Sequence, residues 1–105
     1  MLLKYSETTG TKQAHLGAAV VLFQNQPNPF SAETLVSFVL PDACVVQLRI
    51  FDLAGRELLY LKNAYPAGYN FEKLRLDALT ASGVLFYELT TPFGVLTKRM
   101  MRVGK

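Results

Sequence analysis

Hydrophobic and polar residues alternate along this chain in short runs that are separated by turn-forming residues. The clearest run is Cys44–Asp52, where Val46, Leu48 and Ile50 fall on one face of an extended chain. This pattern predicts strands at Val20–Gln24, Thr34–Leu40, Cys44–Asp52, Arg56–Lys62, Asn70–Asp77, Val84–Thr91 and Val95–Val103. With turn signals between these runs and no amphipathic helix, we predict an all-β fold, an immunoglobulin-like antiparallel β-sandwich of about seven strands. A small barrel is the alternative.

The inward positions of the predicted strands define a candidate core. It comprises Val36, Phe38, Leu40, Val46, Leu48, Ile50, Leu59, Leu74, Leu76, Leu85, Tyr87 and Leu89. We expect the first and last strands to lie at sheet edges. Met1–His15 is polar and without period, so we expect residues 1–15 to be a linker and residues 16–105 to be one domain, which suits a chain of 105 residues.

Positive charge is concentrated at the C-terminal end. The formal net charge is +3, but residues 1–88 hold seven basic and eight acidic side chains, a sum of −1. The last seventeen residues carry +4 and no acid, from Lys98, Arg99, Arg102 and Lys105. These side chains fit either a solvated edge strand guarded against strand addition or an electrostatic handle for an acidic partner. Four charges without interleaved aromatic residues argue against nucleic-acid binding.

The residues that usually carry catalysis or metal binding are scarce. The chain has one cysteine, Cys44, and one histidine, His15, so neither a disulfide framework nor a multi-histidine metal site is available. Ser82 has no base near it in sequence. We therefore expect no enzymatic activity and no cofactor. The longest apolar run, Leu16–Phe23, is too short to span a bilayer, so we expect no transmembrane segment. We also expect the protein to be a monomer.

Three short motifs predict specific backbone conformations. Pro27-Asn28-Pro29-Phe30 removes two backbone donors and predicts a rigid corner, with Phe30 buried as a plug. The run Asp52–Glu57 predicts a hairpin turn in which Gly55 has a positive φ and Arg56 pairs with Asp52 or Glu57. Ser82-Gly83 predicts a turn before a strand. A structural role accounts for each of these motifs, and a recognition role is compatible with it.

Taken in order, these motifs resemble a known family. The corner Pro27–Phe30, the turn residues Asp52, Gly55, Arg56 and Glu57, the pair Ser82-Gly83 and the basic last strand together resemble the type A C-terminal sorting domain of the type IX secretion system of Bacteroidetes. The resemblance covers about Val21–Lys105 and implies an immunoglobulin-like fold.

The resemblance also implies a function. Such a domain directs a larger, covalently fused cargo through an outer-membrane translocon, and a sortase-like protease then removes it as the cargo is anchored. The implied location is the periplasm in transit and then the cell surface or exterior. Lys98, Arg99, Arg102 and Lys105 are the candidate recognition residues, and Met1–His15 is the expected linker to the cargo.

The sequence is also compatible with a second class of function, that of a binding module. An immunoglobulin-like accessory module that binds carbohydrate or another protein needs an exposed aromatic patch. The candidates by position are Tyr60, Tyr65, Tyr69 and Phe93.

Overall fold

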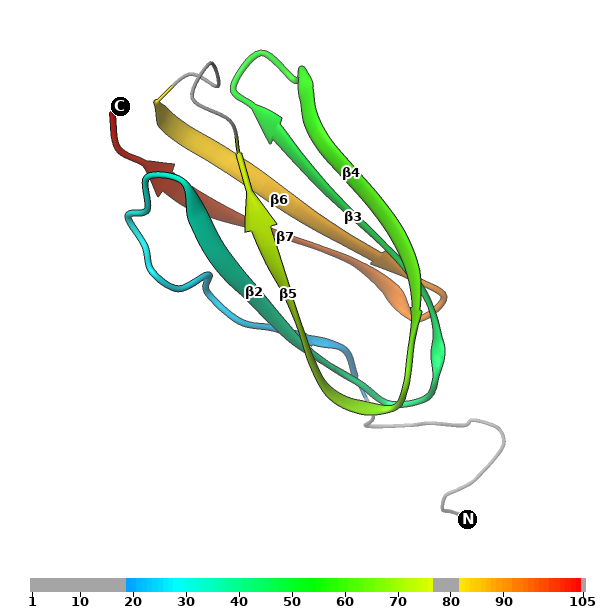
Figure 1. The fold of residues 1–105 in the computed structure, drawn as a ribbon. Coiled ribbons are helices and arrows are strands. Elements are labelled where there is room, and N and C mark those ends of the chain that lie inside the picture. The colour runs from blue at the N-terminus through cyan, green and yellow to red at the C-terminus, as the bar shows by residue number, and fades with distance from the viewer. Residues whose placement is uncertain (1–18, 77–81, 105) are drawn as a thin grey trace.

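The computed structural model describes residues 19–76 and 82–104, which form a β-sandwich (Figure 1). Its strands are β1 (Val21–Leu22), β2 (Glu33–Leu40), β3 (Cys44–Asp52), β4 (Glu57–Tyr65), β5 (Gly68–Arg75), β6 (Gly83–Thr91) and β7 (Gly94–Arg102). The predicted fold class and strand number are therefore confirmed. The expected linker Met1–His15 and the basic residue Lys105 lie outside the described residues.

Two separate antiparallel sheets pack face to face, which rules out the barrel. One sheet has the order β1-β2-β5 and the other has the order β4-β3-β6-β7. The predicted edge positions of the first and last strands are confirmed, with β5 and β4 at the other two edges. Figure 1 shows β2 and β5 lying over β6 and β7, so the apolar faces of the two sheets enclose the core between them.

The observed and predicted strand boundaries differ most at the first strand and between β4 and β5. The first strand is only Val21–Leu22, although the chain stays beside β2 as far as the isolated bridge between Gln26 and Leu35 before it enters the proline-rich corner. Strand β4 runs to Tyr65 and β5 begins at Gly68, so the predicted loop 63–68 shrinks to a short turn at Pro66 and Ala67. Gly68 has a φ of 96°, which only glycine adopts readily and which allows this tight reversal.

The core follows from the alternation. Every predicted core residue except Leu59 is buried, and Leu59 packs partly exposed against the cluster from edge strand β4. Leu22, Phe30 and Met100 complete the cluster. Cross-strand pairing arranges these side chains in layers, as in the row Leu61–Leu48–Leu89–Leu96 across β4, β3, β6 and β7. Within the described ranges, no helix is long and apolar enough to cross a membrane.

Candidate functional site

The corner Pro27–Phe30 is built on a small buried polar network. Asn25 is 1% exposed, and its side-chain amide donates to the carbonyl oxygen of Pro27 at 3.2 Å and to the hydroxyl of Thr34 at 3.0 Å. The Thr34 hydroxyl donates to the same Pro27 carbonyl at 2.9 Å. The ring of Phe30 is buried in the core, as the sequence predicts. The corner is therefore held by its own polar groups and anchored by one aromatic side chain.

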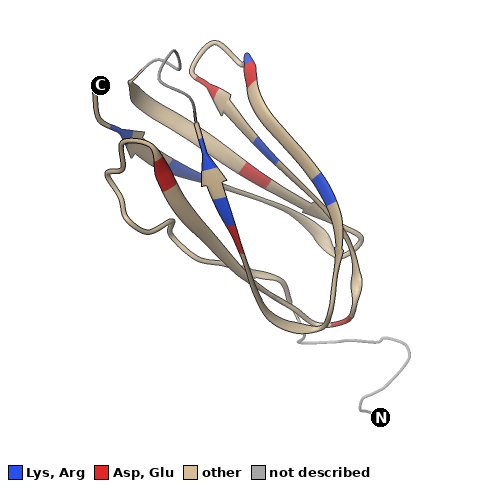
Figure 2. Ribbon diagram, in the orientation of Figure 1, with Lys and Arg blue, Asp and Glu red and all other residues tan. Residues whose placement is uncertain are grey.

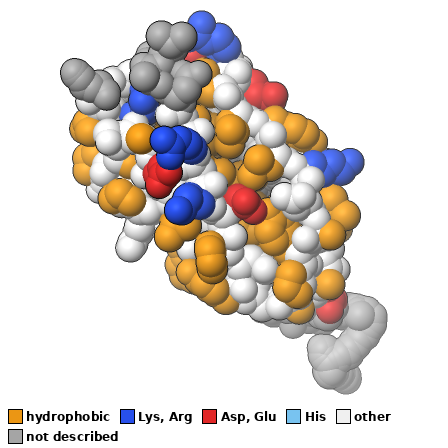
Figure 3. Space-filling view, viewed as in Figure 1, with side chains coloured by type: hydrophobic (Ala, Val, Ile, Leu, Met, Phe, Trp, Pro, Cys, Tyr) orange, Lys and Arg blue, Asp and Glu red, His pale blue; other side chains and the backbone are white. Residues whose placement is uncertain are grey.

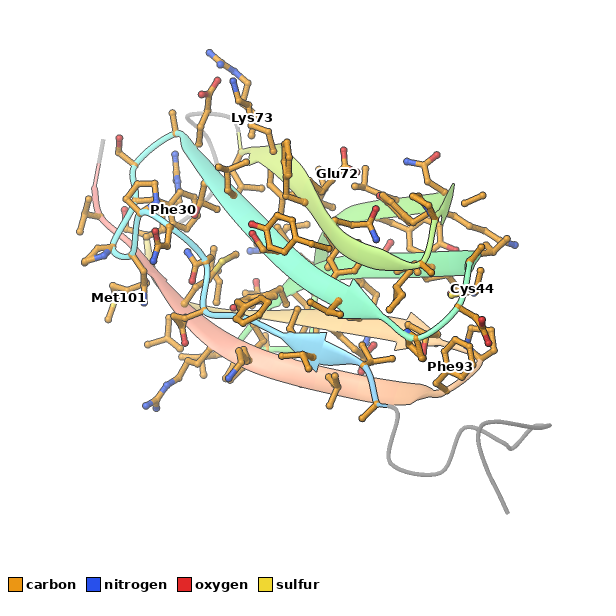
Figure 4. The ribbon with its side chains drawn as sticks, turned by 90° about the horizontal axis from the view of Figure 1, so that it is seen from below. Phe30, Cys44, Glu72, Lys73, Phe93 and Met101 are labelled. Atoms are coloured by element: carbon orange, nitrogen blue, oxygen red, sulfur yellow. The ribbon has the colours of Figure 1, made fainter. Side chains whose placement is uncertain are left out.

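The same corner closes the outer edge of the last strand. The backbone N–H of Phe30 donates to the carbonyl oxygen of Met101 at 3.1 Å, and that of Val103 donates to the carbonyl oxygen of Phe30 at 2.8 Å. The Asn28 side chain accepts from the backbone N–H of Met101 at 2.9 Å. Figure 4 shows Phe30 and Met101 together at one end of the sandwich. We call these contacts between Asn28, Phe30, Met101 and Val103 the clasp. They supply the pairing that an edge strand otherwise lacks.

Next to the clasp, Gln24 covers a further position on the outer edge of β7. The side-chain amide of Gln24 donates to the carbonyl oxygen of Arg99 at 2.7 Å and to the side-chain oxygen of Asn25 at 2.8 Å. The outer edge of β7 is thus covered at Arg99 and Met101, and the same edge is covered at Val103, just after the strand ends. Backbone and side-chain pairing, more than repulsion between charges, protects this end of the edge.

The basic residues of the last strand do not form one surface. Arg102 is only 3% exposed, and its Nε donates to the carbonyl oxygen of Ser31 at 2.6 Å. Lys98 is half-buried on the same face, and Arg99 is exposed on the opposite face, cross-strand from Phe86. Alternate residues of a strand point to opposite sides, so neighbouring basic residues are separated. The expectation of a solvated basic strand is therefore wrong for Arg102, whose guanidinium helps hold the corner.

The outer face of the four-stranded sheet, to which Arg99 belongs, is otherwise charge-balanced. Arg49 lies 3.1 Å from the carboxylate of Glu88 and 3.8 Å from that of Glu57, and its guanidinium sits 4.7 Å from the ring centre of Phe51. Figure 2 shows basic and acidic residues spread over both sheets. Among the described residues, the excess positive charge of the C-terminal segment is therefore exposed mainly at Arg99.

The Asp52–Glu57 motif is a hydrogen-bonded turn. The Asp52 carboxylate accepts the backbone N–H groups of Ala54 at 3.0 Å and Arg56 at 2.9 Å, and it pairs with the Arg56 side chain at 3.1 Å. The hydrogen bond from the Arg56 backbone is the main reason that the pKa of Asp52 lies below its ordinary value. Gly55 has a φ of 85°, as predicted, and Arg56 pairs with Asp52. Formation of the turn therefore explains the presence of Asp52, Ala54, Gly55 and Arg56 in the motif.

The remaining sequence candidates also have structural roles. Gly83, with a φ of 114°, starts β6 opposite Arg102, and Ser82 is exposed just before it. Burial, and then the charge of Asp42, raise the pKa of the Cys44 thiol, which disfavours a reactive thiolate. Within residues 19–76 and 82–104, no group of three or more His, Cys, Asp or Glu side chains is arranged to hold a metal ion.

The four aromatic residues selected from the sequence do not form one patch. Tyr65 is only half-exposed, because its ring packs edge-on against Phe38 at 5.1 Å and its hydroxyl donates to Glu72. Tyr60 is exposed on β4 in the four-stranded sheet, whereas Tyr69 is exposed on β5 in the three-stranded sheet. Phe93 lies at the end of the sandwich opposite Phe30 and Met101 (Figure 4). The expectation is thus wrong for Tyr65, and the other three residues lie apart.

A different aromatic cluster lies on the outer face of the three-stranded sheet. The ring of Tyr69 is 6.4 Å from that of Phe23 and 6.4 Å from that of Phe71. Sequence reasoning missed both Phe23, which is far from Tyr69 on the chain, and Phe71. The signal available was that Phe71 is two residues from Tyr69 and so shares its face of a strand.

Comparison with known proteins supports the fold alone. Neither a protein-family model nor a curated protein matches the sequence. The structure is similar to the sensor domain of the anti-sigma factor RsgI4 from Pseudobacteroides cellulosolvens, with a TM-score of 0.53 and 7% sequence identity. The match covers 86% of this chain and 100% of that domain. At this identity the likeness shows a shared sandwich architecture.

Proposed function

We propose that this chain is a non-catalytic sorting domain of the type IX secretion kind, which directs a covalently fused cargo through an outer-membrane translocon. The observation that carries the proposal is the clasp. The corner motif and the last strand are the two segments of the resemblance that lie farthest apart in sequence, and Asn28 and Phe30 bind directly to Met101 and Val103. A partner that contacts the end of the chain therefore meets both motifs on one folded surface.

The positions of the basic side chains indicate which part of the surface such a partner contacts. Arg99 is the exposed basic residue of β7 beside the clasp, and Arg102 supports the corner from within. In this proposal Arg99 contacts the translocon and Arg102 maintains the shape that it recognises. The linker cleaved by a sortase-like protease precedes the sandwich.

The test is an export assay. The full chain is fused to the C-terminus of a reporter that carries its own signal peptide, and the fusion is expressed in a type IX-competent host and in a strain that lacks the translocon. We expect the reporter outside the cell only in the competent host. Retention in the periplasm of both strains, or release from both, contradicts the proposal.

A matched pair of variants tests the role of Arg99. Arg99→Glu and Lys62→Glu make the same charge change at exposed strand positions, one beside the clasp and one on β4. We expect Arg99→Glu to reduce export and Lys62→Glu to leave it unchanged, with equal thermal stability of the two domains. Equal export of both variants contradicts the role of Arg99 and leaves the sorting function to the first assay.

A further inference from the structure

Three exposed aromatic rings cluster on the outer face of the sheet formed by β1, β2 and β5. Phe23, Tyr69 and Phe71 are 43%, 63% and 59% exposed, which is unusual for large apolar side chains in such close proximity. Figure 3 shows hydrophobic side chains gathered over β2 and β5, next to a group of charged ones. We call Phe23, Tyr69 and Phe71 the aromatic platform.

A small residue at the centre of the platform leaves a hollow. Ser37 is paired with Phe71 on one side, and on the other its carbonyl oxygen accepts the backbone N–H of Phe23 at 3.0 Å. The hydroxyl of Tyr69 donates to the Ser37 hydroxyl oxygen at 2.9 Å, which fixes the tyrosine ring over the sheet. The resulting hollow has a volume of about 290 Å³ and is lined by Phe23, Gln24, Gln26, Leu35, Ser37 and Tyr69.

The lining combines apolar rings with uncharged polar groups. Two glutamine amides and two hydroxyls surround the hollow, and no charged side chain lines it. The Gln24 amide nitrogen is already held by Asn25 and by the Arg99 carbonyl, so this group is fixed before any ligand arrives. Pre-positioned polar groups beside aromatic side chains are typical of a small-ligand site.

The nearest charges lie further along the same face, where two cations share one carboxylate. Glu33 pairs with Arg75 and lies 3.9 Å from the ammonium of Lys73. Lys73 is directly cross-strand from Leu35, one step beyond the hollow. Since no charged side chain lines the hollow, its lining offers an acidic ligand no cationic partner, and charge complementarity favours a neutral ligand.

We propose that the aromatic platform and its hollow bind a neutral glycan. The C–H groups of a sugar ring carry partial positive charge and suit the negative face of an aromatic ring, and the sugar hydroxyls suit amide and hydroxyl partners. A protein hot spot is less well matched, because its centre is usually apolar and fully desolvated, whereas Ser37 and the Tyr69 hydroxyl occupy the centre here. This proposal goes beyond the sorting function and does not depend on it.

The test uses the whole chain on an array of neutral and acidic glycans, followed by calorimetric titration with the neutral oligosaccharide that is retained. We expect Tyr69→Ala to weaken that binding by about tenfold or more, the equivalent of about 1.4 kcal/mol, because it removes a ring against which the sugar packs. Phe71→Ala, at a side chain that is exposed and outside the hollow, provides a second variant with the same expected direction.

Tyr60→Ala is the matched control, because it removes an exposed tyrosine from the other sheet, and we expect its affinity to equal that of the unchanged chain. Thermal unfolding of all three variants separates lost binding from lost folding. Retention of no neutral glycan, retention of acidic glycans only, or equal affinities for Tyr69→Ala and Tyr60→Ala would overturn the proposal. So would a platform that captures only a protein.

Discussion

The buried hydroxyl group of Tyr87 donates a hydrogen bond to the backbone carbonyl oxygen of Phe23 at 2.7 Å. The backbone N–H of Asn25 donates to the same hydroxyl at 2.9 Å. Tyr87 belongs to β6 in the four-stranded sheet, and Phe23 and Asn25 follow β1 in the three-stranded sheet. One side chain therefore satisfies two backbone groups where the chain leaves β1, and it joins the two sheets next to the corner.

Replacing Tyr87 with Phe tests this link. The variant keeps the ring but leaves the Phe23 carbonyl and the Asn25 N–H without their partner, which costs about 1–3 kcal/mol of unfolding free energy when the groups are buried. Urea unfolding measures the loss. Tyr60→Phe removes the hydroxyl of an exposed tyrosine and serves as the control, for which we expect no change beyond about 0.5 kcal/mol. Equal stabilities of the two variants would contradict the account.

The raised pKa values of Tyr87 and Tyr65 predict a loss of stability in alkali. Burial raises the pKa of Tyr87 to about 12, and burial together with the hydrogen bond to Glu72 raises that of Tyr65 to about 12. An unfolded tyrosine titrates near about 10, so between these values the unfolded chain releases protons that the folded chain keeps. Stability is thus fully present below about pH 10 and falls as the pH rises toward about 12.

Unfolding measured at a series of alkaline pH values checks this prediction. Tyr87→Phe removes one of the two raised groups, so its stability should fall less steeply with pH than that of the unchanged chain. Tyr60→Phe should follow the unchanged chain. A slope that is identical in all three proteins would show that Tyr87 does not contribute.

Arg99 and Arg102 are predicted to differ sharply in their effect on stability. Arg102→Ala removes a buried side chain and its hydrogen bond to Ser31, and we expect a loss of about 1–3 kcal/mol. Arg99→Ala removes the same charge from an exposed position, and we expect a change within about 0.5 kcal/mol. Chemical unfolding of the two variants at one pH compares them directly, and similar losses would contradict the burial of Arg102.

The sheet architecture could be predicted because alternation is a local property. Val46, Leu48 and Ile50 alternate with polar neighbours, and all three are buried as expected. The same alternation predicts the face on which Arg102 lies. Arg102 is two residues from the buried Met100 and therefore shares its face. The basic run drew attention to charge, although the period of the strand already indicated that its members point in opposite directions.

The clasp and the aromatic platform could not be predicted in the same way. Phe30 pairs with Arg102, seventy-two positions away on the chain, and no local pattern specifies that register. Phe23 comes close to Tyr69 only because Phe23 and Phe71 flank Ser37 from the two sides of β2. Contacts of this kind depend on sheet order, which is a property of the whole fold.

Amide hydrogen exchange tests whether the corner closes the outer edge of the last strand. In the unchanged chain the Met101 and Val103 amides should be protected, since they donate to Asn28 and Phe30 at 2.9 and 2.8 Å. Asn28→Ala should speed exchange at Met101 by about tenfold, the equivalent of one hydrogen bond, while Leu85 inside β6 is unaffected. Met101 and Val103 amides that exchange in the unchanged chain as fast as an open strand edge would contradict the account.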